Sequence, residues 1–539
     1  MGRSHQMKTL TVTILSLFLN AAAALASVTD HVNPFVGSSN YGTTNPGALC
    51  PNGMMSVTPF NVMGSEANRF DKDSRWWSTP YSSDNCFFTG FSHVNLSGVG
   101  CPEVGIILTM PTTGEVNPDY HIYGSEMHDQ QAEPGWYGCT LGSYGIRAEA
   151  TATTRTCVER YTYPAGRSNI IVNLGEGLTN ETGAWLRKIS DTEIEGMRLA
   201  GTFCYNPQAV FPVYFAIRIS KQPSEGGFWK MQPKMSGVEA AWTADDGTYK
   251  MYRRYGREIA GDDIGYWFSF DTHEGEQVEL QMAVSFVSCE NAWKNLEAEQ
   301  GSLQTGKAFE TVRRQAHEKW ESDLSKIKVS GGSEKDKEVF YTALYHALIH
   351  PSILNDVNGE YPLMENGGIG KVEAGENRYT VFSLWDTYRN LHQLLTLVYP
   401  ERQRDMVRSM VSMYREWGWM PKWELFGRET FTMEGDPAIP VITDTWLKGI
   451  RDFDIETAYE AFVKSAETPG AQNRMRPDND PYKGKGYIPL GFFAAELSGD
   501  NSVSHALEYY VADNALSLLA ADLGKTEDAA LYRQRSLGY

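Results

Sequence analysis

The hydrophobic periodicity of this chain changes near residue 290, and that change constrains the fold more than any other feature. Before it, apolar and polar residues alternate in short runs punctuated by Gly and Pro, which is typical of strands. The longest run, residues 146–164, reads IRAEATATTRTCVERYTYP, and SNIIVNLG, VYFAIRISK and QVELQMAVSFVS are further strand signals. Many strands without helices between them predict a large antiparallel β-sandwich over residues 28–290.

After a charged helical linker at residues 291–330, the apolar spacing becomes helical. Paired helices joined by short loops predict an α/α toroid over residues 331–539, so the fold class is multidomain β + α. A closed toroid of six helix pairs needs about twelve helices, and the pattern indicates fewer, so we expect a partial toroid. The predicted helices cover residues 335–350, 383–399, 401–417, 436–453, 455–465, 502–523 and 526–539.

Tryptophans and carboxylates are interleaved between residues 385 and 454. A sugar ring has apolar faces that stack on indoles and hydroxyls that bond to carboxylates, and cleaving a glycoside takes two carboxyl groups. The segment therefore indicates a carbohydrate site, and the alternative is a Trp-rich helical core with solvated acids between the rings. The residues are Trp385, Trp417, Trp419, Trp423 and Trp446 with Asp386, Glu416, Glu424, Glu429, Glu434, Asp436 and Asp444.

The net charge and the N-terminal residues indicate which partners the protein avoids and where it is located. The chain has 48 Lys and Arg against 67 Asp and Glu, a net charge of −19, which disfavours nucleic acid and anionic membranes. Lys8 precedes the apolar residues 10–19, and Ala24-Leu25-Ala26 is a small-residue cleavage site. We expect a signal peptide at residues 1–26 and export to the periplasm, the cell surface or the medium, without stable membrane insertion. The alternative is an N-terminal anchor.

The seven cysteines lie at positions 50, 86, 101, 139, 157, 204 and 289, and none has C-x-x-C spacing. A disulfide between Cys139 and Cys157 across a hairpin is one option, and buried free thiols are the other.

Ordered motifs along nearly the whole chain resemble glycoside hydrolase family 92, the calcium-dependent inverting exo-α-mannosidases. VNPFVG at residues 32–37 is similar to the family's opening motif. GFSHVNLSGVG at residues 90–100 and LWDTYR at residues 384–389 are similar to its GFSH.HLSG.G and WDTFR motifs. The other matching segments are NPGALCPNGMMSVTP, WELFGRET with EGDPAIPVITDTWLKGI, GYIP, and SVSHALEYYVADNALSLLA.

The resemblance implies an N-terminal β-supersandwich, a helical linker and a C-terminal (α/α)6 barrel. It also places the family's general acid and general base in EGN and GNDD motifs, and neither string occurs in this sequence. We therefore expect the acid, the base and most calcium ligands beyond Tyr539, with the metal ligands unknown. α-Mannosyl glycans are the implied partners.

The candidate substrate-binding residues come from both halves of the chain. Asp386 and Arg389 share a helix face, so Asp386 could accept sugar hydroxyls while Arg389 holds it, or the two could form a surface ion pair. Trp423 and Glu424 fit a stacking ring beside a carboxylate. The full set is Trp76, Trp77, His93, Asn95, Asp386, Arg389, Trp423, Glu424, Glu429 and Asp436.

Each remaining candidate has a structural alternative. Trp76 and Trp77 could form a sugar platform or be buried at the domain junction. His93 and Asn95 could face the cleft or bond within their loop. Asp436 precedes Pro437 and could cap a helix instead of binding a ligand.

Three functions compete. The leading hypothesis is an inverting exo-α-mannosidase, with α-1,2-linked mannose of N-glycans or mannans as substrate, inactive as a fragment without its acid and base. In such a fragment Glu424 and Glu429 belong to the substrate wall. The alternatives are a non-catalytic glycan-binding chain and a glycoside phosphorylase, and the latter would need a phosphate site for which the sequence offers no basic cluster.

Overall fold

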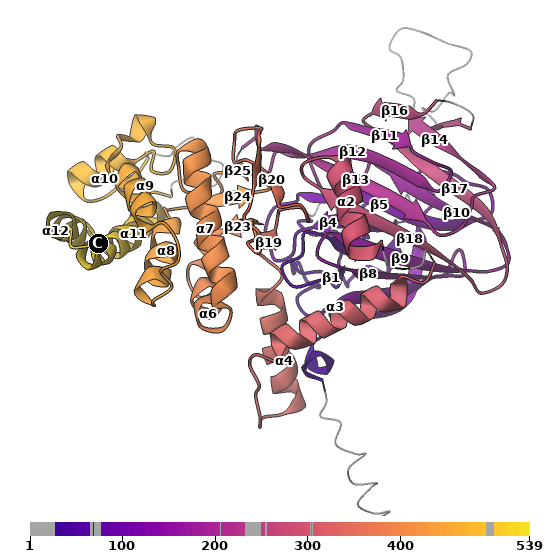
Figure 1. The fold of residues 1–539 in the computed structure, drawn as a ribbon, viewed down its shortest axis with the longest axis horizontal. Helices are drawn as coiled ribbons and strands as arrows, with labels where there is room; N and C mark the ends of the chain where they lie inside the picture. Colours follow the sequence, from indigo (N-terminus) through magenta and orange to yellow (C-terminus); the bar gives the residue numbers. More distant parts are fainter. Residues whose placement is uncertain are drawn as a thin grey trace, which may run out of the picture.

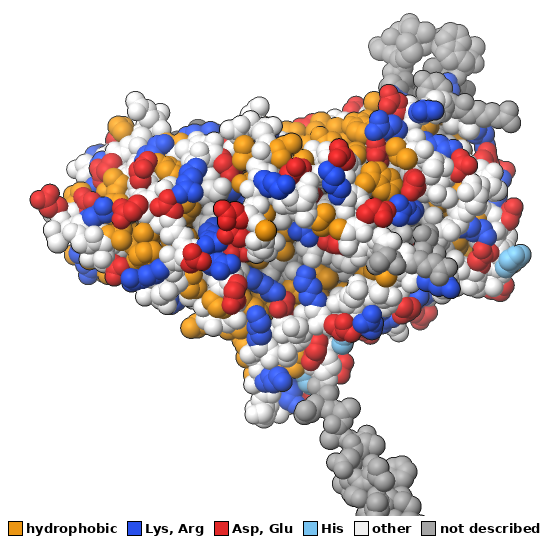
Figure 2. Space-filling model, in the orientation of Figure 1, with side chains coloured by type: hydrophobic (Ala, Val, Ile, Leu, Met, Phe, Trp, Pro, Cys, Tyr) orange, Lys and Arg blue, Asp and Glu red, His pale blue; other side chains and the backbone are white. Residues whose placement is uncertain are grey.

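The computed structural model describes residues 27–64, 68, 77–204, 206–231, 249–253, 256–301, 303, 306–491 and 501–539. The predicted signal peptide and Trp76 lie outside these residues. A β-domain and a helical domain lie side by side along the long axis of the molecule (Figure 1). Acidic and basic side chains are interspersed over both domains on the face drawn in Figure 2.

The first domain is a sandwich of two antiparallel sheets. The eight-stranded sheet runs in the order β1 (Ala48–Leu49), β2 (Ser56–Pro59), β4 (Phe91–Asn95), β5 (Val104–Thr113), β10 (Gly166–Asn173), β17 (Ile264–Thr272), β14 (Glu225–Met231) and β15 (Tyr249–Tyr252). The ten-stranded sheet runs in the order β16 (Glu258–Gly261), β11 (Ala184–Lys188), β12 (Glu193–Gly201), β13 (Val210–Ile219), β18 (Glu276–Ser285), β9 (Thr156–Tyr163), β8 (Ile146–Ala152), β7 (Trp136–Leu141), β6 (Ser125–Glu133) and β3 (Phe87–Phe88). The long alternating run at residues 146–164 is the β8–β9 hairpin, whose register pairs Ala152 with Cys157.

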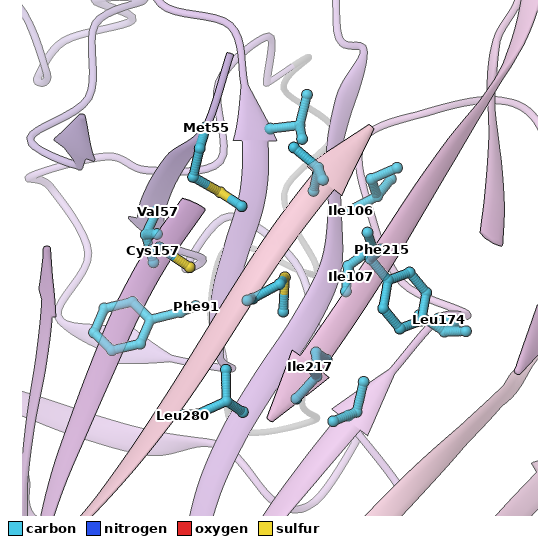
Figure 3. Packing of buried hydrophobic residues seen from close by; sticks show 14 of the residues in the cluster. Met55, Val57, Phe91, Ile106, Ile107, Cys157, Leu174, Phe215, Ile217 and Leu280 are labelled. Carbon is cyan, nitrogen blue, oxygen red and sulfur yellow. The ribbon is translucent and has the colours of Figure 1, made fainter. Parts of the chain in front are cut away.

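Apolar side chains of the two sheets meet in the sandwich interior (Figure 3). Phe91 and Ile106 come from the eight-stranded sheet, and Phe215, Ile217 and Leu280 come from the other, all with exposed fractions of 0%. Burial of this apolar surface is the main term that stabilises the domain.

The predicted linker consists of two helices that lie against the ten-stranded sheet. The first, α2 (Cys289–Gln300), packs on β18 and β13, and the second, α3 (Phe309–Leu324), packs on β7, β8 and β9. The Ser288 side chain accepts the Asn291 N–H and caps α2. The Glu279 carboxylate on β18 accepts the Ala308 and Phe309 N–H groups at the start of α3, at 3.0 and 3.3 Å. These contacts fix the segment to the sandwich.

The rest of the described chain is helical, with short strands inserted before and after the middle helices. A three-stranded sheet, β23-β24-β25, faces the sandwich. The helices are α4 (Glu334–Ala347), α5 (Leu384–Thr387), α6 (Leu391–Val398), α7 (Pro400–Trp417), α8 (Ala438–Leu447), α9 (Ile455–Glu467), α10 (Asn479–Lys485), α11 (Ser502–Asp522) and α12 (Thr526–Arg535). The strands are β19 (Ser352–Ile353), β20 (Glu360–Pro362), β21 (Ile369–Lys371), β22 (Tyr379–Thr380), β23 (Phe382–Ser383), β24 (Trp423–Leu425) and β25 (Arg428–Glu429), and two 3-10 turns lie at Val28–His31 and Gly470–Gln472.

Aromatic side chains join the two domains. Phe203 packs on Trp423 with ring centroids 4.6 Å apart, and Phe426 packs on Phe211 and Phe286 at 5.0 and 4.3 Å. We call these five rings the interdomain seam. They belong to the same buried cluster as the sandwich core, so the sandwich and the three-stranded sheet form one continuous apolar interior.

The predicted fold class is confirmed, because an antiparallel β-sandwich precedes a helical domain. One local prediction is wrong, and one open choice is decided in favour of buried free thiols. Residues 383–399 form two helices, α5 and α6, with Asn390 between them at φ −155°. Cys139 and Cys157 are buried free thiols, because β7 and β9 flank β8 and are therefore about 10 Å apart, beyond disulfide reach. Among the described residues, no helix has the length and apolarity needed to cross a membrane.

Candidate functional site: a cavity between the two domains

A cavity of about 390 Å³ lies where the β-sandwich meets the helical domain. The sandwich contributes the loop at residues 97–101 and Phe203, and the helical domain contributes the end of α4, α5 and residues near β24. A volume of this size is in the range of small-molecule sites. The lining residues are Ser97, Gly98, Val99, Gly100, Cys101, Phe203, His346, Ala347, His350, Pro351, Val381, Ser383, Asp386, Thr387, Leu391, Trp423, Thr432 and Met433.

The sandwich side of the cavity is fixed by a disulfide between Cys101 and Cys204, 103 residues apart. Cys101 precedes β5 of one sheet and Cys204 follows β12 of the other, so the bond joins loops of opposite sheets. Beside it, the buried Glu103 carboxylate accepts the Val104 and Gly201 N–H groups. Burial raises the pKa of Glu103 to about 7.

Two histidines at the end of α4 give the cavity neutral hydrogen-bonding groups. The Ser97 N–H donates to Nε2 of His350 at 3.3 Å, so Nδ1 carries the proton and donates to Ser352 Oγ at 2.9 Å. Burial lowers the pKa of His350 to about 4 and also lowers the pKa of His346. Both rings are therefore uncharged at neutral pH. The sequence offered no motif that would have identified them.

Asp386, one of the candidate substrate-binding residues, contributes its carboxylate to this cavity. It lies on α5 with its side chain exposed, and the Ser383 hydroxyl donates to Oδ2. Arg389 does not hold it. The Arg389 guanidinium instead donates to Glu508 Oε1 at 2.8 Å and to the Trp385 carbonyl at 3.2 Å. Asp386 and Arg389 were predicted to interact on a shared helix face, but Arg389 bonds to Glu508 and to the Trp385 carbonyl instead.

Trp423 also lies at the cavity, but its ring is 2% exposed and packs on Phe203. Trp77 is half-buried outside the cavity lining and stacks on Tyr41 with ring centroids 6.0 Å apart. Tyr41 is 60% exposed, so this stack is an aromatic surface of the sandwich domain.

His93 and Asn95 do not face the cavity, which corrects the prediction for both. His93 is fully buried inside the sandwich, with Nε2 2.8 Å from a Glu159 oxygen and Nδ1 2.6 Å from the Ile107 carbonyl. Asn95 bonds to the Ser56 and Ser92 backbone and side chains within its own sheet. Both residues satisfy buried polar groups of the sandwich.

Glu424 and Glu429 face each other across the β24–β25 hairpin and are fully buried. Glu429 accepts the N–H groups of Lys422, Trp423 and Phe431 at 2.8–3.0 Å. Glu424 accepts Gly427 N–H at 2.6 Å and the Thr380 hydroxyl at 2.9 Å. Burial raises the pKa of both, to about 8 for Glu424. These carboxylates organise the hairpin and do not form a substrate wall.

Asp436 is neither a cavity residue nor a side-chain cap. It is 2% exposed and accepts the Ser465 hydroxyl at 2.5 Å, while Arg476 Nε lies 3.3 Å away. Arg476 in turn pairs with the buried Asp513 at 2.8 Å. Charged side chains are found inside a protein core when they are paired and hydrogen-bonded, as these three are.

Two family models match the chain. The glycosyl hydrolase family 92 N-terminal domain matches residues 31–285, and the glycosyl hydrolase family 92 catalytic domain matches residues 291–539. The chain belongs to glycoside hydrolase family 92. The predicted family is therefore confirmed.

Solved structures of family 92 have the same fold. A family 92 α-mannosidase of Bacteroides thetaiotaomicron, also solved in complex with mannoimidazole, is 32% identical with a TM-score of 0.81. That comparison covers 95% of this chain and 64% of the other. An inverting family 92 mannosidase of the same organism is 23% identical with a TM-score of 0.78, covering 96% of this chain and 65% of the other.

A curated relative of this family 92 chain is an uncharacterized secreted glycosidase of Arthroderma benhamiae. It is 25% identical over 544 residues, which cover 96% of this chain and 62% of the relative. The chain therefore spans less than two thirds of the length of the relatives it matches.

The calcium implied for family 92 has no fitting site among the residues that the structure describes. Nowhere in the described ranges do three or more His, Cys, Asp or Glu side chains gather in an arrangement that could hold a metal ion. Hard oxygen ligands in numbers of six to eight are what calcium requires. Calcium therefore stays a prediction, and no step below passes through it.

Proposed function

We propose that this chain belongs to an exported inverting exo-α-mannosidase and that the interdomain cavity binds the terminal mannose. Membership of family 92 supports the glycosidase activity. The mannoimidazole complex of the 32% identical relative supports a mannosyl ligand. The single observation that carries the proposal is the cavity itself, in which Asp386 and Trp423 meet residues from the sandwich.

The chemistry of the lining fits a neutral sugar. The Asp386 carboxylate can accept hydroxyl protons, and the Ser383 hydroxyl fixes its orientation. Neutral His346 adds a polar group without charge, whereas both nitrogens of His350 are already bonded to Ser97 and Ser352. Apolar surface from Val99, Leu391 and Met433, which line the cavity and stay partly exposed, suits the C–H faces of a pyranose.

We assign substrate binding, not bond cleavage, to Asp386. Inversion requires an acid that protonates the glycosidic oxygen and a base that activates water, with carboxyl groups about 6.5–9.5 Å apart. Glu424 and Glu429 are turned into the hairpin, where their oxygens accept backbone N–H groups, so neither is assigned as acid or base. We also propose a preference for α-1,2 linkages, supported by the sequence CPEVG at Cys101–Gly105, whose Cys101 lines the cavity.

The test is mannose release from α-1,2-, α-1,3- and α-1,6-mannobiose, together with calorimetric binding of mannoimidazole. Wild type should bind mannoimidazole, and D386N should bind it about tenfold or more weakly, since a hydrogen bond to a charged group contributes about 1.5–3 kcal/mol. The matched control is D271N, because Asp271 is exposed on β17 and is not part of the cavity.

Each outcome separates the three functions. Mannose release without phosphate supports the mannosidase and excludes the phosphorylase. Binding without release on any linkage supports a glycan-binding role for the chain. Failure of wild type to bind mannoimidazole, or equal binding by D386N, contradicts the proposed cavity.

A further inference from the structure

The helix that carries Asp386 is too short to fix its own orientation. It has four residues, Leu384–Thr387, closed by the hydrogen bond from Tyr388 N–H to the Leu384 carbonyl at 2.9 Å. Isolated helices below about 12 residues are marginal in water, because nucleation fixes several residues for one hydrogen bond. Tertiary contacts must therefore set the rotation of α5 and, with it, the direction of the Asp386 carboxylate.

One residue of a distant helix supplies three of these contacts. Glu508 of α11 accepts Trp385 Nε1 at 3.1 Å, the Tyr388 hydroxyl at 2.7 Å and Arg389 Nη2 at 2.8 Å. The three donors lie at positions i, i+3 and i+4 and therefore share one face of the turn. Successive side chains of an α-helix are rotated by about 100° around its axis. Asp386, the residue after Trp385, therefore points away from Glu508 and lies at the cavity.

The surroundings of Glu508 hold this arrangement together. The Glu508 side chain is 14% exposed, and the Arg389 guanidinium also lies over the Trp385 and Tyr388 rings, 4.7 and 4.9 Å from their centroids. Burial, with the adjacent Glu508 carboxylate, raises the pKa of Tyr388 to about 12, so the phenol keeps its proton and donates. Charge-assisted bonds of this kind are the stronger class of hydrogen bond.

The close approach of α11 depends on a glycine. Gly435 has φ +80°, and a Cβ added there would lie 2.6 Å from the Glu508 Cβ. Only a residue without a side chain leaves room for Glu508 at this distance. Gly435 lies two residues after Met433, which lines the cavity, so the same loop contacts both the sugar site and the Glu508 anchor.

We propose that Glu508 is a positioning residue. Its carboxylate accepts hydrogen bonds from Trp385, Tyr388 and Arg389 and thereby orients the Asp386 carboxylate toward the sugar cavity. The inference rests on the proposed function of the cavity, and it assigns to α11 a part in sugar binding although Glu508 does not line the site. Arg389, predicted to contact Asp386 directly, then acts on it through Glu508.

The first experiment measures the anchor without ligand. Hydrogen exchange of the amides at residues 384–388 should be about tenfold faster in E508A than in wild type, because α5 loses its tertiary contacts. E508Q, which keeps one oxygen acceptor, should recover part of the protection. The control is E460A, since Glu460 accepts the Tyr414 hydroxyl at 2.8 Å, a similar bond between α9 and α7 remote from α5.

The second experiment measures the consequence for binding with a double-mutant cycle on mannoimidazole affinity. E508A should weaken binding about tenfold, E508Q about threefold and E460A less than twofold. In the D386N background, E508A should add less than about twofold, because both changes remove the same interaction. Thermal unfolding midpoints of all variants verify that each remains folded.

The outcomes distinguish the two proposals. Unchanged exchange in E508A, or full additivity with D386N, overturns the positioning role even if wild type binds the sugar analogue. If wild type does not bind mannoimidazole, the proposed function of the cavity is overturned, and the role of Glu508 in sugar binding falls with it.

Discussion

Asp386 and the Glu424–Glu429 pair lie in the same Trp-rich part of the chain, yet the structure uses them in opposite ways. Asp386 lies in a cavity and receives one bond, from Ser383. Glu429 is fully buried and receives three backbone N–H groups, and Glu424 receives one N–H and one hydroxyl. The difference shows that a carboxylate beside a tryptophan is available to a ligand only where its oxygens are not already committed to the backbone.

The largest expected effect is a loss of stability when Glu429 of the buried pair is replaced. E429A should lower the free energy of unfolding by about 4 kcal/mol, because three buried N–H groups of the β24–β25 hairpin lose their acceptor. Urea unfolding followed by fluorescence measures this. A loss below about 1 kcal/mol would contradict the organising role and return Glu429 to the candidate binding residues.

The second expected effect is a pH dependence of stability that comes from Glu424. The folded-state pKa of Glu424, about 8, lies above its ordinary value of 4.5, so the folded protein binds more protons between these values. The stabilising contribution of the protonated group is complete below about pH 4.5 and is lost as pH rises through about 8. From pH 5 to pH 9, wild type should lose roughly 4 kcal/mol relative to E424Q, whose amide does not ionise.

Parallel unfolding curves of wild type and E424Q across this pH range would mean that Glu424 is ionised in the folded state at all pH values tested. The control is E527Q, because Glu527 is exposed on α12 and should leave the pH dependence unchanged.

The smallest expected effect is on the stability of the cavity side. D386N should change the free energy of unfolding by less than about 0.5 kcal/mol, because the side chain is exposed and the amide oxygen still accepts the Ser383 hydroxyl. Thermal unfolding measures the change. A destabilisation comparable with that of E429A would erase the distinction between the two sites.

The sequence was sufficient to predict the order of domains and most regular elements. Period-two alternation indicated strand structure at residues 146–164, where the β8–β9 hairpin lies, and helical spacing predicted the helix at residues 401–417, which is α7 and ends at Gly418 with φ +92°. Family motifs identified Asp386 and Trp423, which do meet at the cavity.

The remaining features depend on tertiary contacts that a local pattern does not contain. β24 and β25 are three and two residues long, too short for a periodic signal, so the hairpin that commits Glu424 and Glu429 was not foreseen. The Cys101–Cys204 disulfide requires both sheets to be assembled. His350 lies at the cavity beside Ser97, which comes from the other domain.

The interdomain seam also has a consequence for biosynthesis. A ribosome releases Phe203, Phe211 and Phe286 well before Trp423 and Phe426, the rings that cover them. A sandwich that folded as it emerged would carry an uncovered aromatic surface until the β24 hairpin arrived, and such surfaces favour aggregation. Delayed folding of the sandwich, or a chaperone bound during that interval, would keep this aromatic surface from other chains.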